Sequence, residues 1–250
     1  MVEELLLIVF GFLVGMVAAF MGIGGGVLFV PILVLIFGFD MRRAIGTSLL
    51  AILITAASST IAYLRERKIN FRLGLLLEAA SVPGAVLGAY FAAKAPVIIL
   101  KTLFIVLLVG MSIKIVRGNN IPEVDDFNAS LEKRGLAQAL ALSFLAGFLS
   151  ASLGIGGGVL KVPILVTTLK IPIHQAIGTS VFMILITVAT GLSQHLYYGH
   201  VDVLHGTLLG IGAMFGAQLG VRASLKTKPR KLRVLFSVLL LAIAIRMLLA

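Results

Sequence analysis

The 250-residue chain contains no cysteine and no tryptophan, and only 12% of its residues are charged. The absence of cysteine excludes disulfide bonds, thiolate metal sites and persulfide chemistry. The charged residues are too few to cover a soluble globule, since 60% of the chain is hydrophobic. The sequence also lacks a P-loop and a Gly-x-Ser-x-Gly motif, and its apolar segments hold no combination of nucleophile, base and orienting acid. We therefore expect neither an enzyme nor an ATP-driven pump.

Eight apolar runs predict an all-α integral membrane protein. Each run is close to the roughly 20 residues that a membrane-crossing helix requires. The predicted spans are Leu5 to Met21, Ala44 to Leu64, Leu73 to Ala93, Val97 to Val116, Leu136 to Leu153, Ala176 to Leu196, Val203 to Val221 and Leu232 to Leu249. The N-terminal MVEELLLIVF lacks the basic start of a cleaved signal peptide. The first run is thus expected to belong to a mature, multi-pass protein of the cytoplasmic (inner) membrane.

The sequence contains an internal repeat. Residues 22–48 and 154–180, at a constant offset of 132, are identical at 17 of 27 positions without a gap. The shared stretches GIGGGVL, VPILV and AIGTS indicate duplication. A polar stretch, GNNIPEVDDFNASLEKR, follows the first copy. We therefore predict a membrane repeat over 1–118, a cytoplasmic linker over 119–134 and a second membrane repeat over 135–250.

The positive charges predict that the two repeats are inverted. Cytoplasmic loops carry excess Lys and Arg, so the net charge of +11 requires no nucleic-acid partner. The loop RERKINFR is basic, its counterpart YYGHVDVL has no Lys or Arg, and the next pair of loops reverses this bias. The resulting topology puts both termini outside and the linker in the cytoplasm, and Arg42 and Arg43 fit it worst. Each repeat then holds a glycine-tipped, broken-helix or re-entrant hairpin followed by three spans.

The glycine tips, predicted to lie near the middle of the membrane, are the first candidate site. Non-helical chain at membrane depth survives only where protein or a water-filled cavity surrounds it, and glycine lets a ligand approach the backbone. Pro31 and Pro163 favour non-helical chain just before them. Free N–H groups at the starts of the following half-helices would then bind an anion. The residues concerned are Gly24, Gly25, Gly26, Gly156, Gly157 and Gly158. Close helix packing is the alternative role of these glycines.

The pattern GIGGG-x4-P followed by AIGTS, present in both halves, resembles the sulfite exporter TauE/SafE family. The resemblance covers essentially the whole chain. It implies a carrier that moves sulfite, sulfonates such as sulfoacetate or related organosulfur anions across the cytoplasmic membrane, generally outward. The matching positions are Gly22, Gly24, Gly25, Gly26, Gly46, Thr47 and Ser48, with Gly154, Gly156, Gly157, Gly158, Gly178, Thr179 and Ser180. The hydroxyls among them either donate to sulfonate oxygens or only cap their helices.

Four further polar residues lie inside predicted spans or close to a glycine tip. Lys161 would pair with a bound sulfonate or extend to an interface, and Gln218 would donate to an oxyanion or bond another helix. Glu78 is a candidate proton carrier, although pairing with Arg72 near the cytoplasmic surface would also explain it. His195 is a second proton-coupling candidate or a hydrogen-bonded structural residue. The histidines near it recur every five residues and share no helix face, so no metal site is expected.

Together these features predict a secondary transporter that moves a small sulfur-containing anion by alternating access of the two repeats. The anion's own electrochemical gradient or a coupled proton would supply the energy. A small-anion channel on the same fold is the first alternative, and a membrane assembly factor without transport activity is the second. The expected partners are the anion and the lipid bilayer, with no cofactor. The sequence leaves open which anion is moved, in which direction, and whether the protein forms a homo-oligomer.

Overall fold

The computed structural model describes residues 2–117, 133–226 and 245, and these form an all-helical bundle without β-strands. The first half contains α1 (Val2–Met21), α2 (Gly26–Leu35), α3 (Met41–Arg65), α4 (Phe71–Lys94) and α5 (Val97–Arg117). The second half contains α6 (Lys133–Leu153), α7 (Gly158–Pro163), the π-helical segment η1 (Ile164–Thr168), α8 (Ile173–Tyr197) and α9 (Val203–Lys226). The predicted all-α fold is confirmed.

Within the described residues, six helices are long and apolar enough to cross a membrane. They are α1, α3, α4, α6, α8 and α9, and each covers one of the predicted spans. The span predicted over Val97 to Val116 corresponds to α5. Apart from residue 245, the span predicted over Leu232 to Leu249 lies outside the described residues, as does most of the predicted linker.

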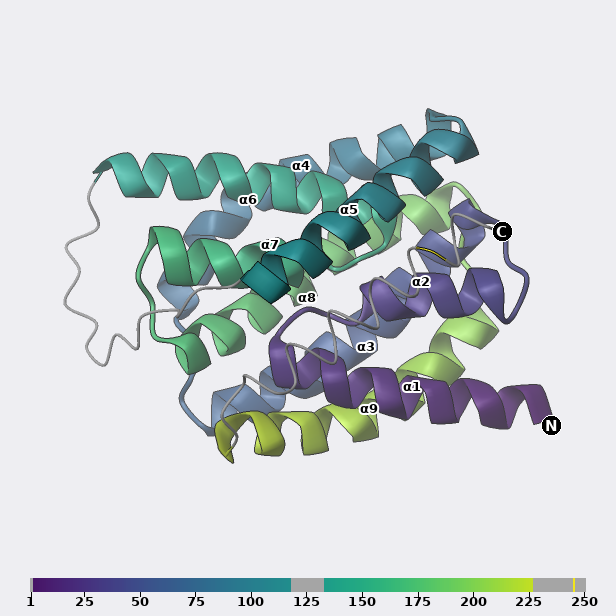
Figure 1. The fold of residues 1–250 in the computed structure, drawn as a ribbon, viewed down its shortest axis with the longest axis horizontal. Coiled ribbons are helices and arrows are strands. Elements are labelled where there is room, and N and C mark those ends of the chain that lie inside the picture. Colours follow the sequence, from purple (N-terminus) through teal and green to yellow (C-terminus); the bar gives the residue numbers. More distant parts are fainter. Residues whose placement is uncertain (1, 118–132, 227–244, 246–250) are drawn as a thin grey trace.

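The helices of the two halves are interleaved. In Figure 1, α1 runs along α9 and α4 runs along α6, while α3 and α8 meet in the middle of the bundle. Glycines allow the close approach at both seams. A Cβ at Gly84 would lie 2.2 Å from the carbonyl oxygen of Phe144, and one at Gly216 would lie 1.9 Å from that of Phe12. These two contacts are related by the same offset of 132, so the repeat in the sequence is also a repeat in the packing.

Equivalent helices of the two halves run in opposite directions along the long axis of the bundle. In Figure 1, α1 runs from right to left, whereas its counterpart α6 runs from left to right. This arrangement is compatible with inverted repeats. The orientation of each half relative to the membrane stays a prediction, because the helices alone carry no record of which end faces the cytoplasm.

Local sequence signals explain where several helices begin. Asp40 caps α3 by accepting hydrogen bonds from the N–H groups of Arg42 and Arg43, and Asn70 caps α4 by accepting one from Leu73. Short polar side chains suit this position because the first N–H groups of a helix lack partners within it. The caps set the junctions between successive membrane helices.

The two arginines that fit the predicted topology worst have structural partners. The Arg42 side chain donates to the carbonyl oxygens of Ala92 and Ala95, at 3.2 and 2.7 Å, where α4 ends. A cation is favourable there because the last carbonyl groups of a helix are unpaired and carry partial negative charge. Arg43 forms an ion pair with Asp202 and lies over the ring of Phe39. Both arginines therefore connect neighbouring helices at their junctions.

Candidate functional site

The two glycine stretches form sharp turns that break the apolar helices. Gly25 and Gly157 precede α2 and α7 with φ values of 88° and 73°, a left-handed conformation that disfavours other residues. The carbonyl oxygen of Gly25 accepts hydrogen bonds from Leu28 and Phe29 and thereby starts α2. All residues from 22 to 31 are buried. The turns are thus enclosed by protein, as chain of this kind at membrane depth requires.

The helices begin earlier than the prolines suggested. Pro31 lies inside α2, five residues after its start at Gly26, and Pro163 ends α7 after a start at Gly158. The prediction of non-helical chain just before each proline is therefore wrong. The left-handed glycines, rather than the prolines, end the non-helical turn. As the sixth residue of its helix, each proline removes one i→i−4 hydrogen bond, and after Pro163 the chain continues as the π-helical segment η1.

The two turns pack directly against each other. A Cβ at Gly26 would lie 1.9 Å from the carbonyl oxygen of Gly154, and one at Gly158 would lie 2.3 Å from that of Gly22. The same carbonyl oxygens accept hydrogen bonds from serine hydroxyls of the opposite half. Ser48 donates to Gly154 at 2.9 Å, and Ser180 donates to Gly22 at 3.1 Å. We call this contact the glycine crossing, comprising residues 22–26 and 154–158. In this conformation, an anion between the turns would have to separate them.

Thr47 and Thr179 connect the starts of the central helices to loops of the opposite half. The Thr47 hydroxyl accepts a hydrogen bond from the N–H of Asp202 at 2.9 Å, and the Thr179 hydroxyl accepts one from Asn70 at 2.9 Å. The glycine preceding each threonine lies against the same loop: a Cβ at Gly46 would be 2.4 Å from a loop carbonyl oxygen. The AIGTS motifs thus bind the opposite repeat in this conformation.

A buried polar cluster lies between α4, α7 and α8. The Lys161 Nζ lies 2.6 Å from Glu78 Oε1 and also donates to Thr187 Oγ1. The Thr187 hydroxyl donates to Glu78 Oε2 at 2.5 Å, and Ser81 Oγ lies 2.9 Å from the same hydroxyl. All four residues are buried, with exposures of 2% or less. We call Glu78, Ser81, Lys161 and Thr187 the charged cluster.

The donor directions in the charged cluster fit an ammonium and a carboxylate. The Thr187 hydroxyl has one hydrogen, which it gives to Glu78, so it accepts from both Lys161 and Ser81. Each carboxylate oxygen of Glu78 then accepts one hydrogen bond. Taking two charges out of water is costly, and the contact between the two charges, together with their hydrogen bonds to Thr187, offsets part of this cost. A charged pair inside a membrane protein indicates function rather than stability.

The corresponding position in the other half is apolar. At the offset of 132, Lys161 corresponds to Phe29 and Glu78 to Gly210, while Ser81 corresponds to Ala213. Phe29 is fully buried, and a Cβ at Gly210 would lie 2.4 Å from the side chain of Ile54. The repeat is therefore closely symmetric in its backbone contacts and asymmetric in charge. The bundle folds with Phe29 and Gly210 at the equivalent positions of the other half, so the architecture of the repeat does not by itself require a charged pair.

Gln218 and His195 lie away from this cluster and bind neighbouring helices. The Gln218 amide donates to the carbonyl oxygen and the hydroxyl of Ser58 on α3, at 3.0 and 2.8 Å. The Nε2 of His195 donates to the carbonyl oxygen of Ala151 at 2.9 Å. Tyr63, its counterpart, donates to Ala19 at 3.0 Å in the equivalent contact. In this conformation both residues form hydrogen bonds to neighbouring helices, which was one of the two roles that the sequence allowed for each of them.

A second charged group lies at the α8–α9 junction, where Asp202 and His200 are outside the spanning helices. Burial raises the pKa of Asp202, but hydrogen bonds from His205 and Arg43 outweigh it and hold the pKa at about 2. Glu3 lies 3.2 Å from the same His205. Burial lowers the pKa of His200, as does the nearby Arg42. This group joins the first turns of α1, α3 and α9 and suits a structural role at the surface.

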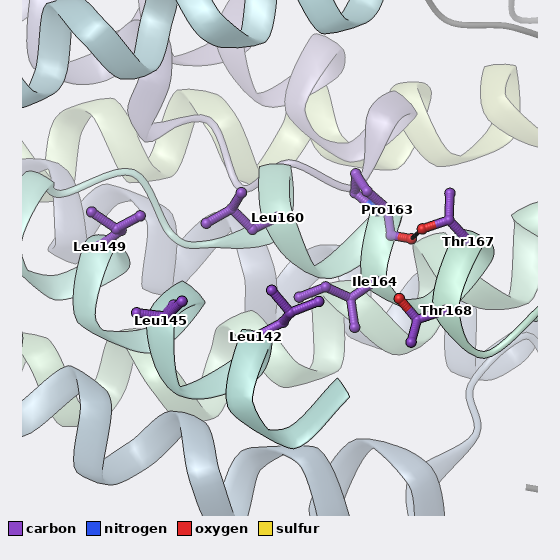
Figure 2. A pocket seen from close by; sticks show the side chains of 8 residues that line it. All are labelled: Leu142, Leu145, Leu149, Leu160, Pro163, Ile164, Thr167 and Thr168. Carbon is purple, nitrogen blue, oxygen red and sulfur yellow. Dashed lines mark hydrogen bonds between the residues drawn. The ribbon is translucent and has the colours of Figure 1, made fainter. Parts of the chain in front are cut away.

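An apolar pocket of about 230 Å³ lies between α6 and the α7–η1 segment. Figure 2 shows its lining, where the Thr167 hydroxyl donates to the Pro163 carbonyl oxygen. The lining residues are Leu142, Leu145, Leu149, Leu160, Pro163, Ile164, Thr167 and Thr168. None of them is charged, so the pocket is poorly suited to an anion. The described residues contain no cluster of acidic, cysteine and histidine side chains that could hold a metal ion.

Sequence reasoning found Lys161 and Glu78 separately and missed that they pair. It also missed Ser81 and Thr187, whose hydroxyls complete the cluster. One signal was available: Lys161 and Glu78 are oppositely charged, both lie in apolar segments, and both replace an uncharged residue of the other repeat. Their separation of 83 residues hid the contact.

Comparison with known proteins adds the family. A sequence model described as "Sulfite exporter TauE/SafE" matches residues 7–247. "Probable membrane transporter protein YunE" of Bacillus subtilis is 28% identical over 258 residues, covering 95% of this chain and 94% of the relative. "Probable membrane transporter protein MJ0441" of Methanocaldococcus jannaschii is 29% identical over 259 residues, covering 98% and 95%. No solved structure matches. With six candidate spans in its described part and a match over nearly its whole length, the chain belongs to the sulfite exporter TauE/SafE family of membrane transporters.

Proposed function

We propose that this protein exports a small sulfur-containing anion, such as sulfite or a sulfonate, across the cytoplasmic membrane. The observation that carries the proposal is the ammonium of Lys161, fully buried in the bundle, three residues past the second glycine turn. A sulfonate or sulfite oxygen would accept hydrogen bonds from this ammonium and from the Thr187 hydroxyl. The anion class itself comes from the family, whose name refers to sulfite.

The glycine crossing would be the contact that changes during transport. Its carbonyl groups, glycines and serines are shared between the halves, so a rocking motion of one repeat against the other would open it. The predicted binding glycines, together with Thr47, Ser48, Thr179 and Ser180, would then expose N–H and O–H donors beside Lys161. Alternating access around a site near the membrane midplane is the usual mechanism for two inverted repeats. In this proposal both termini lie outside and the linker lies in the cytoplasm.

Energy for export would come from the anion gradient, with or without a coupled proton. An inside-negative potential favours the exit of an anion by about 2.3 kcal/mol per charge per 100 mV. The chain has no ATP-binding motif. The described residues also show no catalytic arrangement around the charged cluster, in which Thr187 bonds the other three members and Lys161 bonds Glu78. A transporter without an enzymatic activity is therefore the proposal.

An anion channel on the same fold is the second candidate, and one measurement separates the two. Liposomes that contain the purified protein are loaded with unlabelled sulfite, and the uptake of radiolabelled sulfite is followed over a range of external concentrations. A carrier predicts saturable uptake that internal sulfite accelerates, whereas a channel predicts uptake without acceleration. Liposomes without protein and liposomes that contain the Lys161→Met variant are the controls, and the variant is expected to lose uptake. Uptake that is equal in wild type and Lys161→Met would refute the proposed site.

A further inference from the structure

The charged cluster has a charge balance that an entering anion must disturb. In the structure, the ammonium of Lys161 and the carboxylate of Glu78 neutralise each other at 2.6 Å. Both side chains are almost fully buried, at 0% and 3% exposure. A monovalent anion bound to Lys161 would leave one net negative charge in a region that solvates charge poorly. Neutrality returns if Glu78 takes up one proton.

Within the described residues, Lys161 is the only ionisable side chain that bonds Glu78. On the helix of Glu78, α4, the nearest other ionisable residues are Arg72 and Tyr90, six and twelve residues away. This helix packs against α6 and α8, and the charged contact of Glu78 comes from α7. From residue 135 onward α6 has no ionisable side chain, and Lys161 is the only one in α7 and η1. The ionisable residues of α8, His174, His195 and Tyr197, lie at its two ends. The nearest of them is eight residues from Thr187, about 12 Å along the helix.

Glu78 also has the hydrogen-bonding environment that both protonation states need. As a carboxylate it accepts from Lys161 and Thr187. As a carboxylic acid it becomes a donor, and the Thr187 hydroxyl can then accept from it and turn its own hydrogen toward a bound anion. Ser81 lies against the same hydroxyl and can follow this rotation. The change requires hydroxyl rotations and leaves the backbone in place.

From this balance we infer that the charged cluster couples the anion to one proton, so that each exported anion leaves together with the proton held by Glu78. The inference rests on the proposed function and specifies its coupling. On the loading side, Glu78 takes a proton from water as the anion replaces it at Lys161. On the release side, the anion departs, the proton returns to water and the ion pair reforms. The loaded and empty forms are both neutral, so the movement of a monovalent anion transfers no net charge. With this coupling the membrane potential does not drive export, and the concentration gradients of the anion and the proton set its direction.

The asymmetry of the repeats fits a single coupling site. The other half holds Phe29 and Gly210 at the corresponding positions, so it contributes neither a cation nor a proton acceptor. One anion and one proton per cycle therefore follow from the sequence as well as from the contacts. Two symmetric sites would carry two of each.

The experiment measures protons and charge moved per anion in proteoliposomes of the full-length protein. The probe is 2-hydroxyethanesulfonate, which stays fully ionised near neutral pH and cannot carry a proton itself. A pH dye inside the vesicles reports protons, and valinomycin with potassium gradients sets the membrane potential. The wild type should acidify the lumen by one proton per anion taken up, with uptake independent of the potential. Glu78→Gln should move no proton, and any uptake should follow the potential.

The control variant is Glu66→Gln, which removes an exposed carboxylate at the end of α3 and should behave as the wild type. If the sulfonate is not taken up, sulfite replaces it, and the charge moved per anion should differ by one between wild type and Glu78→Gln. If Glu78→Gln does not fold or transport, the wild-type ratio of protons to anions decides alone. Wild-type uptake that follows the potential without lumenal acidification overturns the coupling and leaves the proposed function standing. Failure to move either anion overturns both.

Discussion

Removing one partner of the Lys161–Glu78 pair should destabilise the protein more than removing both. Both groups are buried and their oxygen and nitrogen atoms lie 2.6 Å apart. Breaking a buried pair leaves an uncompensated charge and typically costs about 3–5 kcal/mol, whereas replacing both partners is often close to neutral. For a domain of this size, 1 kcal/mol corresponds to about 2–4 °C in Tm. Lys161→Met and Glu78→Gln should therefore each lower Tm by about 6–20 °C.

The double variant Lys161→Met with Glu78→Gln should recover most of this loss. The fold already accommodates an uncharged version of the site, because Phe29 and Gly210 occupy the equivalent positions. The amide of the new glutamine would still have the Thr187 hydroxyl as a partner. The predicted coupling between the two substitutions is thus about 3 kcal/mol or more.

Thermal unfolding in detergent, followed by far-ultraviolet circular dichroism, measures these effects, because the chain has no tryptophan for fluorescence. Lys94→Met is the control, since it removes an exposed lysine at the end of α4 and should change stability by no more than about 0.5 kcal/mol. Single variants within about 1 kcal/mol of the wild type would refute the reasoning. So would a double variant whose loss equals the sum of the single losses.

Three further predictions concern the crossing, the topology and the surface ion pair. Gly26→Ala should prevent stable folding, since its Cβ would lie 1.9 Å from a backbone oxygen. Gly110→Ala should be tolerated, because no atom lies within 4 Å of the Cβ that it adds. Expression level and gel filtration compare the two variants. Arg65→Cys and Tyr197→Cys, at equivalent helix ends, should react with an impermeant maleimide from opposite faces of the membrane, and labelling from one face would contradict inversion. Asp202→Asn should lower the free energy of unfolding at neutral pH by about 1 kcal/mol or less. The difference from the wild type should vanish as the pH falls from about 4 to 2, because folding lowers the pKa of Asp202 to about 2; a difference in Tm that stays constant over this pH range would refute the prediction.

The repeats and the breaks in the helices could be predicted from the sequence because short local motifs specify them. The glycines at 24–26 and 156–158 need no partner to be recognised, since left-handed backbone and close approach select glycine. An offset of 132 then aligns the halves. The pairing of Gly84 with Phe144, by contrast, is a contact between interleaved halves, and a pattern within one helix does not specify which half its partner belongs to.

The charged cluster shows where sequence reasoning ends. The sequence identifies Lys161 as a cation within an apolar segment, but it suggests a bound sulfonate as the partner. It suggests Arg72 as a partner for Glu78, because the two residues are close in the chain. The Lys161–Glu78 pair forms because α4 and α7 meet across the halves. Thr187 carried no signal of its own, since Thr55 occupies the same place in the other repeat and donates to Ala51 on its own helix. The role of a hydroxyl group depends on the residues that surround it in the fold, and the sequence does not show which residues these are.

Ligand-dependent stabilisation tests the central claim that an anion binds at Lys161 most directly. Purified protein is heated with sulfite, thiosulfate, 2-hydroxyethanesulfonate, sulfate, chloride and an organic cation, and the double variant Lys161→Met with Glu78→Gln is measured alongside. The account predicts that a sulfur anion stabilises the wild type, by about 2.7 kcal/mol at one hundred times its Kd, and that the folded double variant shows no such gain. Equal stabilisation of both proteins, or stabilisation of neither, would contradict it.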